Sequence, residues 1–511
     1  MHDWTAGYIA DIGYTFGYYE ELNPLRSRLA LLNKGFALPR SGAACELGFG
    51  QGVSINFHAA AGDARWYGCD FNPSQTAFAV DLAETSGCAP LLTDQNFAEF
   101  CVRDDLPEFS FIGLHGIWSW ISDENRRVLV DFIGRKLKPG GLLYISYNTM
   151  PGWAAFAPLR SLMAEHAEVI GSEGRGRLNR VGDAIEFADQ LLDLNPAFLQ
   201  ANPQVAERLK HLKKQNRHYL AHEYFNRHWD PMPFASMADW LAPAKMQYAC
   251  SAQYLDHVDV LHLTPEQQSF LNDIPDLMFR ESVRDFIFNQ QFRRDYWVKG
   301  ARRIPLLEQV EHLEQQRVVL HTPRADVALK VNGSLGELTM NGNVYNPVLD
   351  LLADHQPRTL AEITAGLGSA TITFYQVMEV VLVLIGAGHL SPCHDDEQVE
   401  RNLPATRRLN AELAHKARSA PDIEYVVSPL TGGGVPLGRF ELLFLDAMAE
   451  GRSGADELAA HVWDCLKRNK QAIIKQGKTL TTEAENLQEL KEQHAVFESR
   501  KLPILRALRV L

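Results

Sequence analysis

One stretch of the sequence decides the fold: Cys45-Glu46-Leu47-Gly48-Phe49-Gly50-Gln51-Gly52-Val53. A short apolar segment at residues 43–48 leads into it, and a helical pattern at residues 52–61 follows. Its three glycines allow a sharp turn and let a ligand approach the backbone where a Cβ would collide. The stretch predicts a strand, a tight turn and a helix. A ligand at the turn is favoured over a bare glycine-rich turn.

The spacing of the glycines indicates which ligand. The dinucleotide fingerprint is G-x-G-x-x-G, and Val53 stands where its third glycine belongs. The pattern G-x-G-x-G preceded by an acidic residue is typical of S-adenosylmethionine sites. We therefore expect S-adenosylmethionine as the cofactor, held at Glu46, Gly48, Gly50 and Gly52.

Three further side chains are candidates for the same ligand. Asp70 ends the next apolar segment, roughly 20 residues beyond the turn, where a carboxylate accepts the ribose hydroxyls. Asp94 follows a third apolar segment and is placed to accept from the adenine amino group, with Phe97 covering the ring. The alternatives are helix caps for the two aspartates and a core position for Phe97.

Two aromatic segments follow later apolar runs of the same region. They are His115-Gly116-Ile117-Trp118-Ser119-Trp120 and Tyr147-Asn148-Thr149-Met150-Pro151-Gly152-Trp153. Carboxyl ends of parallel strands meet at one edge of a sheet, so we expect both segments at the ligand. With Tyr14, Tyr18 and Tyr19 they would form an aromatic cage. The candidate catalytic residues are His115, Trp118, Tyr147, Asn148 and Trp153, against an alternative of ordinary turn and core packing.

These side chains favour a lysine as methyl acceptor. A lysine must lose its proton before methylation, and an aromatic slot poor in water lowers its pKa. Aromatic faces also attract the methylammonium product. A carboxylate acceptor favours basic residues at the mouth, and residues 115–121 and 146–153 contain no Lys or Arg. No metal is needed.

The surrounding pattern is that of an α/β fold. Short apolar runs near 43–48, 65–70, 89–93, 109–115 and 141–147 alternate with helical patterns near 52–61, 74–86, 95–102 and 123–137, typical of a parallel sheet covered by helices. We expect a Rossmann-like core at residues 1–165. Residues 166–300 hold a helical insertion and further strands that complete the sheet with antiparallel edges.

The rest of the chain has a different texture. Two short helices, a longer one and a small hairpin predict a winged-helix-like domain over residues 301–395, and residues 396–511 read as a helical domain interrupted by a flexible Thr431-Gly432-Gly433-Gly434. Whether these C-terminal regions recognise substrate or pair two chains into a homodimer is open.

Composition excludes several classes of protein. Fifty Lys and Arg stand against 63 Asp and Glu, a net charge of −13 that repels nucleic acid. No apolar run approaches the roughly 20 residues of a membrane span, and the N-terminus has no secretory signal, so we expect a cytoplasmic protein. Seven scattered cysteines without a Cys-x-x-Cys pair indicate neither a disulfide framework nor a zinc site.

The chain resembles bacterial class I methyltransferases that carry a methyltransferase regulatory domain. It is most similar to protein lysine methyltransferases that modify outer-membrane proteins. The resemblance rests on the glycine stretch, on both aromatic segments, and on Tyr14-Thr15, Glu21-Leu22-Asn23-Pro24, Tyr219-Leu220-Ala221-His222-Glu223-Tyr224-Phe225-Asn226, Phe292-Arg293-Arg294-Asp295 and Ser428-Pro429-Leu430-Thr431-Gly432. It implies a protein substrate, such as an outer-membrane or surface protein, and the cofactor and acceptor residues named above.

Two alternatives remain open. In a small-molecule methyltransferase, the insertion and the C-terminal region would enclose the acceptor. In a regulatory protein that senses S-adenosylmethionine, residues 327–390 would bind DNA. The second is disfavoured, because the would-be recognition helix at residues 371–384 has no Lys or Arg.

Overall fold

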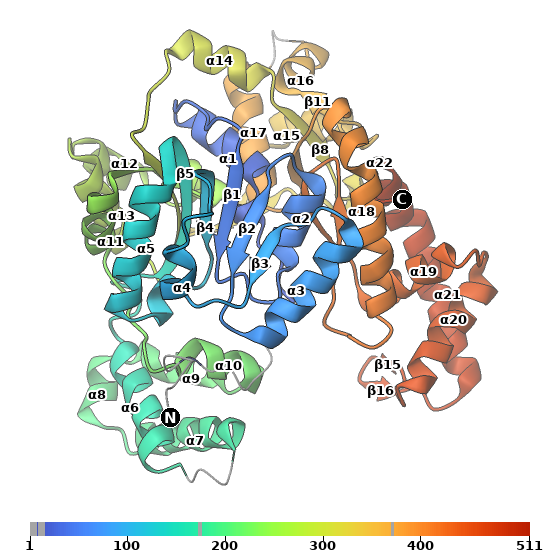
Figure 1. The fold of residues 1–511 in the computed structure, drawn as a ribbon, viewed down its shortest axis with the longest axis horizontal. Coiled ribbons are helices and arrows are strands. Elements are labelled where there is room, and N and C mark those ends of the chain that lie inside the picture. The colour runs from blue at the N-terminus through green and yellow to red at the C-terminus, as the bar shows by residue number, and fades with distance from the viewer. Residues whose placement is uncertain (1–7, 9–15, 172–175, 369–371) are drawn as a thin grey trace.

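The computed structural model describes residue 8 and residues 16–171, 176–368 and 372–511. Within these residues, seven strands form one sheet in the order β3-β2-β1-β4-β5-β7-β6 (Figure 1). The strands are β1 (Ala43–Leu47), β2 (Trp66–Cys69), β3 (Leu91–Thr93), β4 (Phe109–Leu114), β5 (Leu137–Asn148), β6 (Met246–Ser251) and β7 (Phe292–Lys299). Strands β1 to β5 are parallel, and β7 runs antiparallel to both β5 and β6. The late strands complete the sheet as predicted. Both edges were expected to be antiparallel, but β7 alone among these seven strands runs opposite to the others. Because β6 is antiparallel to β7, β6 runs in the same direction as β1 to β5.

Helices cover both faces of the sheet. One face packs against α1, and the other packs against α4, α5 and α11, as the buried clusters around Tyr144 and around Tyr147 show. Three helices between the parallel strands, α3, α4 and α5, begin at side-chain caps: Asn72 accepts from Ser74 N, Asn96 from Glu99 N and Ser122 from Asn125 N. The helices are α1 (Pro24–Asn33), α2 (Val53–Ala61), α3 (Pro73–Ser86), α4 (Phe97–Cys101), α5 (Asp123–Lys136) and α11 (Phe234–Leu241).

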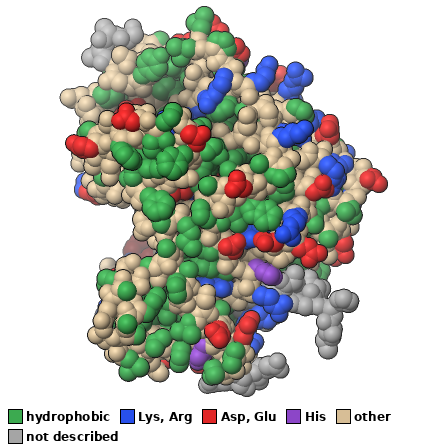
Figure 2. Space-filling view, turned by 90° about the vertical axis from the view of Figure 1, so that its left-hand side faces the viewer, with side chains coloured by type: hydrophobic (Ala, Val, Ile, Leu, Met, Phe, Trp, Pro, Cys, Tyr) green, Lys and Arg blue, Asp and Glu red, His purple; other side chains and the backbone are tan. Residues whose placement is uncertain are grey.

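The insertion is a helical lobe with its own small core. Its described residues contain no strand, as predicted. The lobe consists of α6 (Ala157–Val169), α7 (Arg177–Asp193), α8 (Ala197–Ala201), α9 (Gln204–Leu212) and α10 (Arg217–Tyr224). Trp153 and Phe156 belong to its buried cluster. Figure 2 shows a notch between this lobe and the body of the molecule. The chain then returns through α12 (Pro265–Asn272) and α13 (Leu277–Phe288) beside β6 and β7.

The next region, after β7, contains the predicted helices and hairpin. The helices are α14 (Leu306–Glu314), α15 (Gly342–Leu351), α16 (Leu360–Gly366) and α17 (Phe374–Gly386). The strands are β8 (Arg317–Leu320), β9 (Lys330–Gly333), β10 (Gly336–Thr339), β11 (Arg358–Thr359) and β12 (Leu390–Cys393). The β9-β10 hairpin forms a sheet of its own, and a second sheet has the order β11-β8-β12. The winged-helix comparison stays a prediction, but Val380, Val381 and Leu384 of α17 are fully buried, as expected of core residues.

The C-terminal region packs against the Rossmann-like core. Its elements are α18 (Asp396–Lys416), β13 (Tyr425–Ser428), β14 (Gly433–Pro436), α19 (Arg439–Ala449), α20 (Ala455–Arg468), β15 (Ile474–Lys475), β16 (Lys478–Thr479), α21 (Glu483–Val496) and α22 (Leu502–Ala507). The segment expected to be flexible is instead the turn and second strand of the β13-β14 hairpin. Val53 and Phe57 of α2 share a buried cluster with Val426 and Val427 of this hairpin. Among the described residues, no helix is both long and apolar enough to cross a bilayer.

This packing makes α2 dependent on the C-terminal region, and Phe57 tests it. Phe57 is fully buried, so we expect Phe57→Ala to lower the free energy of unfolding by about 3–5 kcal/mol. Phe279 is 61% exposed, and Phe279→Ala is the matched control, with an expected change within about 0.5 kcal/mol. Urea denaturation of the full chain measures both. Equal, small losses in the two variants would contradict the shared core.

Candidate functional site

A pocket of about 600 Å³ lies at the carboxyl edge of the parallel strands, the place where open α/β sheets bind ligands. We call it the edge pocket. Of the predicted residues, it brings together Glu46, Gly48, Gly50, Asp70, Phe97 and His115. Tyr8, Tyr19, Phe71 and Trp120 add aromatic walls. Tyr14 and Thr15 lie outside the described residues.

The glycines of the turn have different tasks. All three have a left-handed backbone, with φ of 75° at Gly48, 58° at Gly50 and 69° at Gly52. A Cβ on Gly48 would lie 2.3 Å from Ile117 Cδ1 at the pocket wall. A Cβ on Gly52 would lie 2.4 Å from Ala79 Cβ, so Gly52 permits close packing of α2 on α3. Gly52 does not line the pocket, in contrast to our expectation of a ligand contact.

Two buried carboxylates face the edge pocket without a cationic partner among the described residues. Glu46 is 3% exposed, and its Oε2 atom has no hydrogen-bond partner there. Burial raises the pKa of Glu46 well above its usual value, and the nearby Asp70 raises it further. Asp70 accepts hydrogen bonds of 2.9 Å from Gly50 N and from Asn72 N. Burial raises the pKa of Asp70 to about 6, while these two hydrogen bonds oppose the rise.

His115 forms a neutral, aromatic wall of the pocket. Its ring stacks on Tyr19 with the centroids 3.7 Å apart, and its Nδ1 atom is 2.7 Å from the Tyr144 hydroxyl. Burial lowers the pKa of His115 to about 4, so the ring is uncharged near neutral pH. Trp120 lies on the same side, where its Nε1 atom donates to the Glu223 carbonyl oxygen over 3.3 Å.

Helix α10 of the insertion approaches the pocket from outside the sheet. The Tyr8 ring contacts Phe71 edge-on at 5.8 Å and His222 of α10 at 5.7 Å. Glu223 of α10 is half-buried, and its carboxylate forms no ion pair or hydrogen bond with any described residue. Burial raises the pKa of Glu223 to about 7. Burial raises the pKa of the Tyr8 hydroxyl, and the nearby carboxylates of Asp70 and Glu223 raise it further.

Besides Gly52, five predicted residues do not line the edge pocket. Asp94 is exposed at the end of β3. Trp118 is buried in the core, where its Nε1 atom donates to Met232 Sδ over 3.2 Å. In the short 3-10 helix at Trp118–Trp120, Trp120 and not Trp118 lies at the pocket. Tyr147 and Asn148 are buried on β5, and the Tyr147 hydroxyl donates to Asp295 Oδ2 over 2.8 Å. Trp153 belongs to the core of the lobe, under the guanidinium of Arg208.

Sequence reasoning also missed three residues that line the edge pocket, Tyr8, Phe71 and Trp120, and Glu223 beside it. Tyr8 and Phe71 carried no motif of their own. Trp120 belongs to the predicted aromatic segment, but no local pattern indicates whether Trp118 or Trp120 lines the pocket. Glu223 was quoted only as part of the family-like stretch after Tyr219. Contacts between α10 and the pocket are long-range and leave no local pattern.

One other cluster has metal-ligand residue types. Ligand atoms of Asp446, Glu450 and His461 lie within 4.8 Å of one another. The guanidinium of Arg418 pairs with both carboxylates, at 2.6 Å from Asp446 Oδ2. Arg452 also pairs with Glu450, at 3.2 Å, so two arginines already balance the two carboxylates.

Comparisons with known proteins agree with this architecture. The family described as predicted methyltransferase regulatory domain matches residues 216–299. The Synechocystis protein sll1526 is 37% identical over 510 residues, which cover 99% of both chains. The Rickettsia prowazekii protein RP789 is 27% identical over 260 residues, covering 48% of this chain and 44% of that protein.

Solved structures extend the likeness to the whole fold. PKMT2 from Rickettsia typhi in complex with AdoHcy matches with a TM-score of 0.68 at 17% identity, over 98% of this chain and 99% of that one. A further structure of PKMT2 gives 0.66 at 16% identity, over 96% and 99%. The predicted Rossmann-like α/β fold is confirmed. The chain belongs to the same family as sll1526 and shares the fold of PKMT2, and its residues 216–299 match the methyltransferase regulatory domain.

Proposed function

We propose that this protein transfers methyl groups from S-adenosylmethionine to lysine side chains of a protein substrate. The observation that carries the proposal is the pair of buried carboxylates, Glu46 and Asp70, facing the glycine turn with no cation between them among the described residues. S-adenosylmethionine has an ammonium group, a sulfonium and a ribose, which suit these acceptors. The fold shared with PKMT2 supports a protein lysine as acceptor.

The residues of the edge pocket divide the donor between them. We assign the donor's ammonium to the free oxygen of Glu46, its ribose hydroxyls to Asp70 and its adenine to Phe97. Asp94 is exposed at the end of β3, so in this proposal it accepts from the adenine amino group only on the solvent side of the ring. When bound, S-adenosylmethionine supplies an electrophilic methyl group on a sulfonium. The rest of the reaction depends on how the chain presents a neutral amine to it.

The acceptor enters between α10 and the aromatic wall in this proposal. Tyr8, Tyr19, Trp120 and the neutral His115 offer faces that exclude water and attract a cation. Glu223 at this opening is the proton acceptor. Moving a proton from the lysine ammonium to Glu223 leaves two neutral groups, which a water-poor slot favours over two buried charges. The neutral nitrogen then forms its bond to the methyl carbon while the bond from that carbon to sulfur breaks, which leaves a methylammonium on the lysine and the neutral thioether S-adenosylhomocysteine.

Labelled methyl donor tests the function directly. We expect the purified full chain to move label from S-adenosylmethionine into cell-envelope protein, with mass spectrometry locating the added methyl groups on lysine. Metabolite extract from the same cells is the comparison. Label confined to the extract would identify a small-molecule methyltransferase, and tight donor binding without transfer to either would identify a sensor.

Glu46→Gln tests the donor site by two opposite effects. Loss of the charge removes a charge-assisted hydrogen bond of about 1.5–3 kcal/mol, so donor affinity should fall about 10- to 100-fold. The ligand-free variant should be more stable than the parent at pH 8. The raised pKa of Glu46 means that its contribution to stability is complete below pH 4.5 and is lost as pH rises. Calorimetric titration and thermal melts at pH 5 and pH 8 measure both. A stability gain that does not shrink at pH 5 would oppose this assignment.

Glu223→Gln tests the proton acceptor. The pKa of Glu223 is about 7, so the rate of the parent enzyme should rise through pH 7 as the carboxylate ionises. The variant should lose this rise and about 100-fold of its rate, with unchanged donor affinity. Glu207→Gln, at a 67% exposed side chain of the same lobe, is the matched control. The pH profile of initial methyl-transfer rates decides, and a variant profile identical to the parent's excludes Glu223 as the base.

A further inference from the structure

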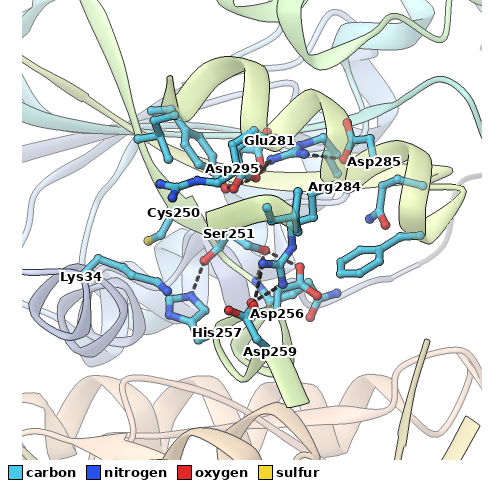
Figure 3. Close-up of a pocket in the computed structure, with 18 of the residues that line it drawn as sticks. Lys34, Cys250, Ser251, Asp256, His257, Asp259, Glu281, Arg284, Asp285 and Asp295 are labelled. Atoms are coloured by element: carbon cyan, nitrogen blue, oxygen red, sulfur yellow. Dashed lines mark hydrogen bonds and ion pairs between the residues drawn. The ribbon is translucent and has the colours of Figure 1, made fainter. Parts of the chain in front are cut away.

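A second pocket, of about 330 Å³, lies at the β6 edge of the sheet, away from the edge pocket. We call it the α13 pocket. It is lined by β6, β7 and α13, by residues 251–259 and by Lys34 after α1. Figure 3 shows Lys34 entering from one side and Glu281 and Asp285 of α13 from the other. All of it except Lys34 and Arg303 falls within the matched regulatory domain.

The inner wall of the α13 pocket holds an excess of negative charge. Arg293 pairs with three carboxylates, at 2.6 Å from Asp285 Oδ1, 3.0 Å from Glu281 Oε2 and 3.0 Å from Asp295 Oδ2. The side chains of Arg293, Asp285 and Asp295 are each at most 6% exposed. Arg284 adds a positive charge close to Glu281, so Asp285 and Asp295 share the single guanidinium of Arg293 and one negative charge is left over. Burying unbalanced charge is costly, so the arrangement favours a further cation.

Asp285 marks where that cation belongs. Its Oδ2 atom is buried and has no hydrogen-bond partner among the described residues. Burial raises the pKa of Asp285 to about 7 in spite of the pairing with Arg293. The neighbouring Arg284 does not supply the partner, because it pairs with Asp259 at 2.7 Å and donates to the Asp256 carbonyl oxygen.

The lining also contains two cationic side chains without an ion-pair partner among the residues that the structure describes. Lys34 and Arg280 form no side-chain hydrogen bond or ion pair with the part of the chain that the structure describes, and both line the pocket. His257 is adjacent to Lys34 but adds no charge, since burial lowers its pKa to about 3. The pocket thus has a deep acceptor of cations at Asp285 and more exposed acceptors of anions at Lys34 and Arg280.

We propose that the α13 pocket binds a small zwitterion of the free amino acid class, with its cationic group on Asp285 Oδ2 and its carboxylate toward Arg280 and Lys34. The volume is at the small end of the range for ligand sites, roughly 300–1,000 Å³. A plain anion meets the unpaired carboxylate oxygen of Asp285, and a plain cation leaves Arg280 and Lys34 unpaired. The inference is independent of methyl transfer.

Calorimetric titration of the full chain tests the proposal. The probes are the twenty free amino acids, with cadaverine as a cation lacking a carboxylate and glutarate as an anion lacking an amine. We expect saturable one-to-one binding of at least one amino acid, and binding at least about tenfold weaker for both controls. Binding of cadaverine or glutarate as tight as any amino acid, or no binding of any probe, overturns the proposal.

Two variants locate the site. Asp285→Asn and Arg280→Ala should each weaken the amino acid about tenfold or more, while S-adenosylmethionine affinity is retained. Arg280 is only half-buried, so its variant keeps the test valid even where Asp285→Asn disturbs the buried cluster. Arg401→Ala, at a 57% exposed arginine of α18, is the matched control. Unchanged amino acid affinity in Arg280→Ala excludes this pocket. Because donor affinity is measured on the same samples, failure here is distinct from failure of the proposed function.

Discussion

Two buried carboxylates, with no balancing cation in the described part of the chain, are the constraint on which the rest of the site depends. Glu46 and Asp70 come from adjacent parallel strands and face the same glycine turn, which Asp70 holds through Gly50 N. Desolvation makes both ionised forms unfavourable in the free protein. A cationic ligand with hydroxyl donors relieves this cost, so the site is less stable empty than filled. Stability given up at a site and recovered on binding is a common arrangement in functional sites.

The rest of the chain positions this turn and covers it. Tight packing of α2 on α3 at Gly52 sets the backbone of the turn, and the C-terminal hairpin buries the outer face of α2. From the other side, α10 approaches the aromatic wall, where the Glu223 carbonyl oxygen accepts from Trp120 Nε1. The matched regulatory domain therefore both completes the sheet, through β6 and β7, and contributes to the proposed acceptor opening.

Local patterns predicted the parts of this structure that depend on neighbouring residues. The glycine turn, the parallel strands and the positions of Glu46, Asp70, Phe97 and His115 follow from strand ends meeting at one edge. Side-chain direction within a short helix does not follow from the spacing of residues. The sequence therefore predicts Trp118 at the pocket, whereas Trp120 lines it. Tyr147 was predicted at the pocket but is buried on β5, where its hydroxyl donates to Asp295. Asp295 lies 148 residues away in sequence, so no local pattern indicates this contact. Glu223 and the reversed strand β7 depend on the same kind of long-range contact.

A crystal structure of the chain with S-adenosylhomocysteine bound tests the central assignment most directly. The account predicts the ligand's ammonium within hydrogen-bond distance of Glu46 Oε2 and its ribose hydroxyls on Asp70, with the nucleoside against the glycine turn. A ligand bound away from this turn, or a complex in which Glu46 Oε2 still has no partner, would contradict it.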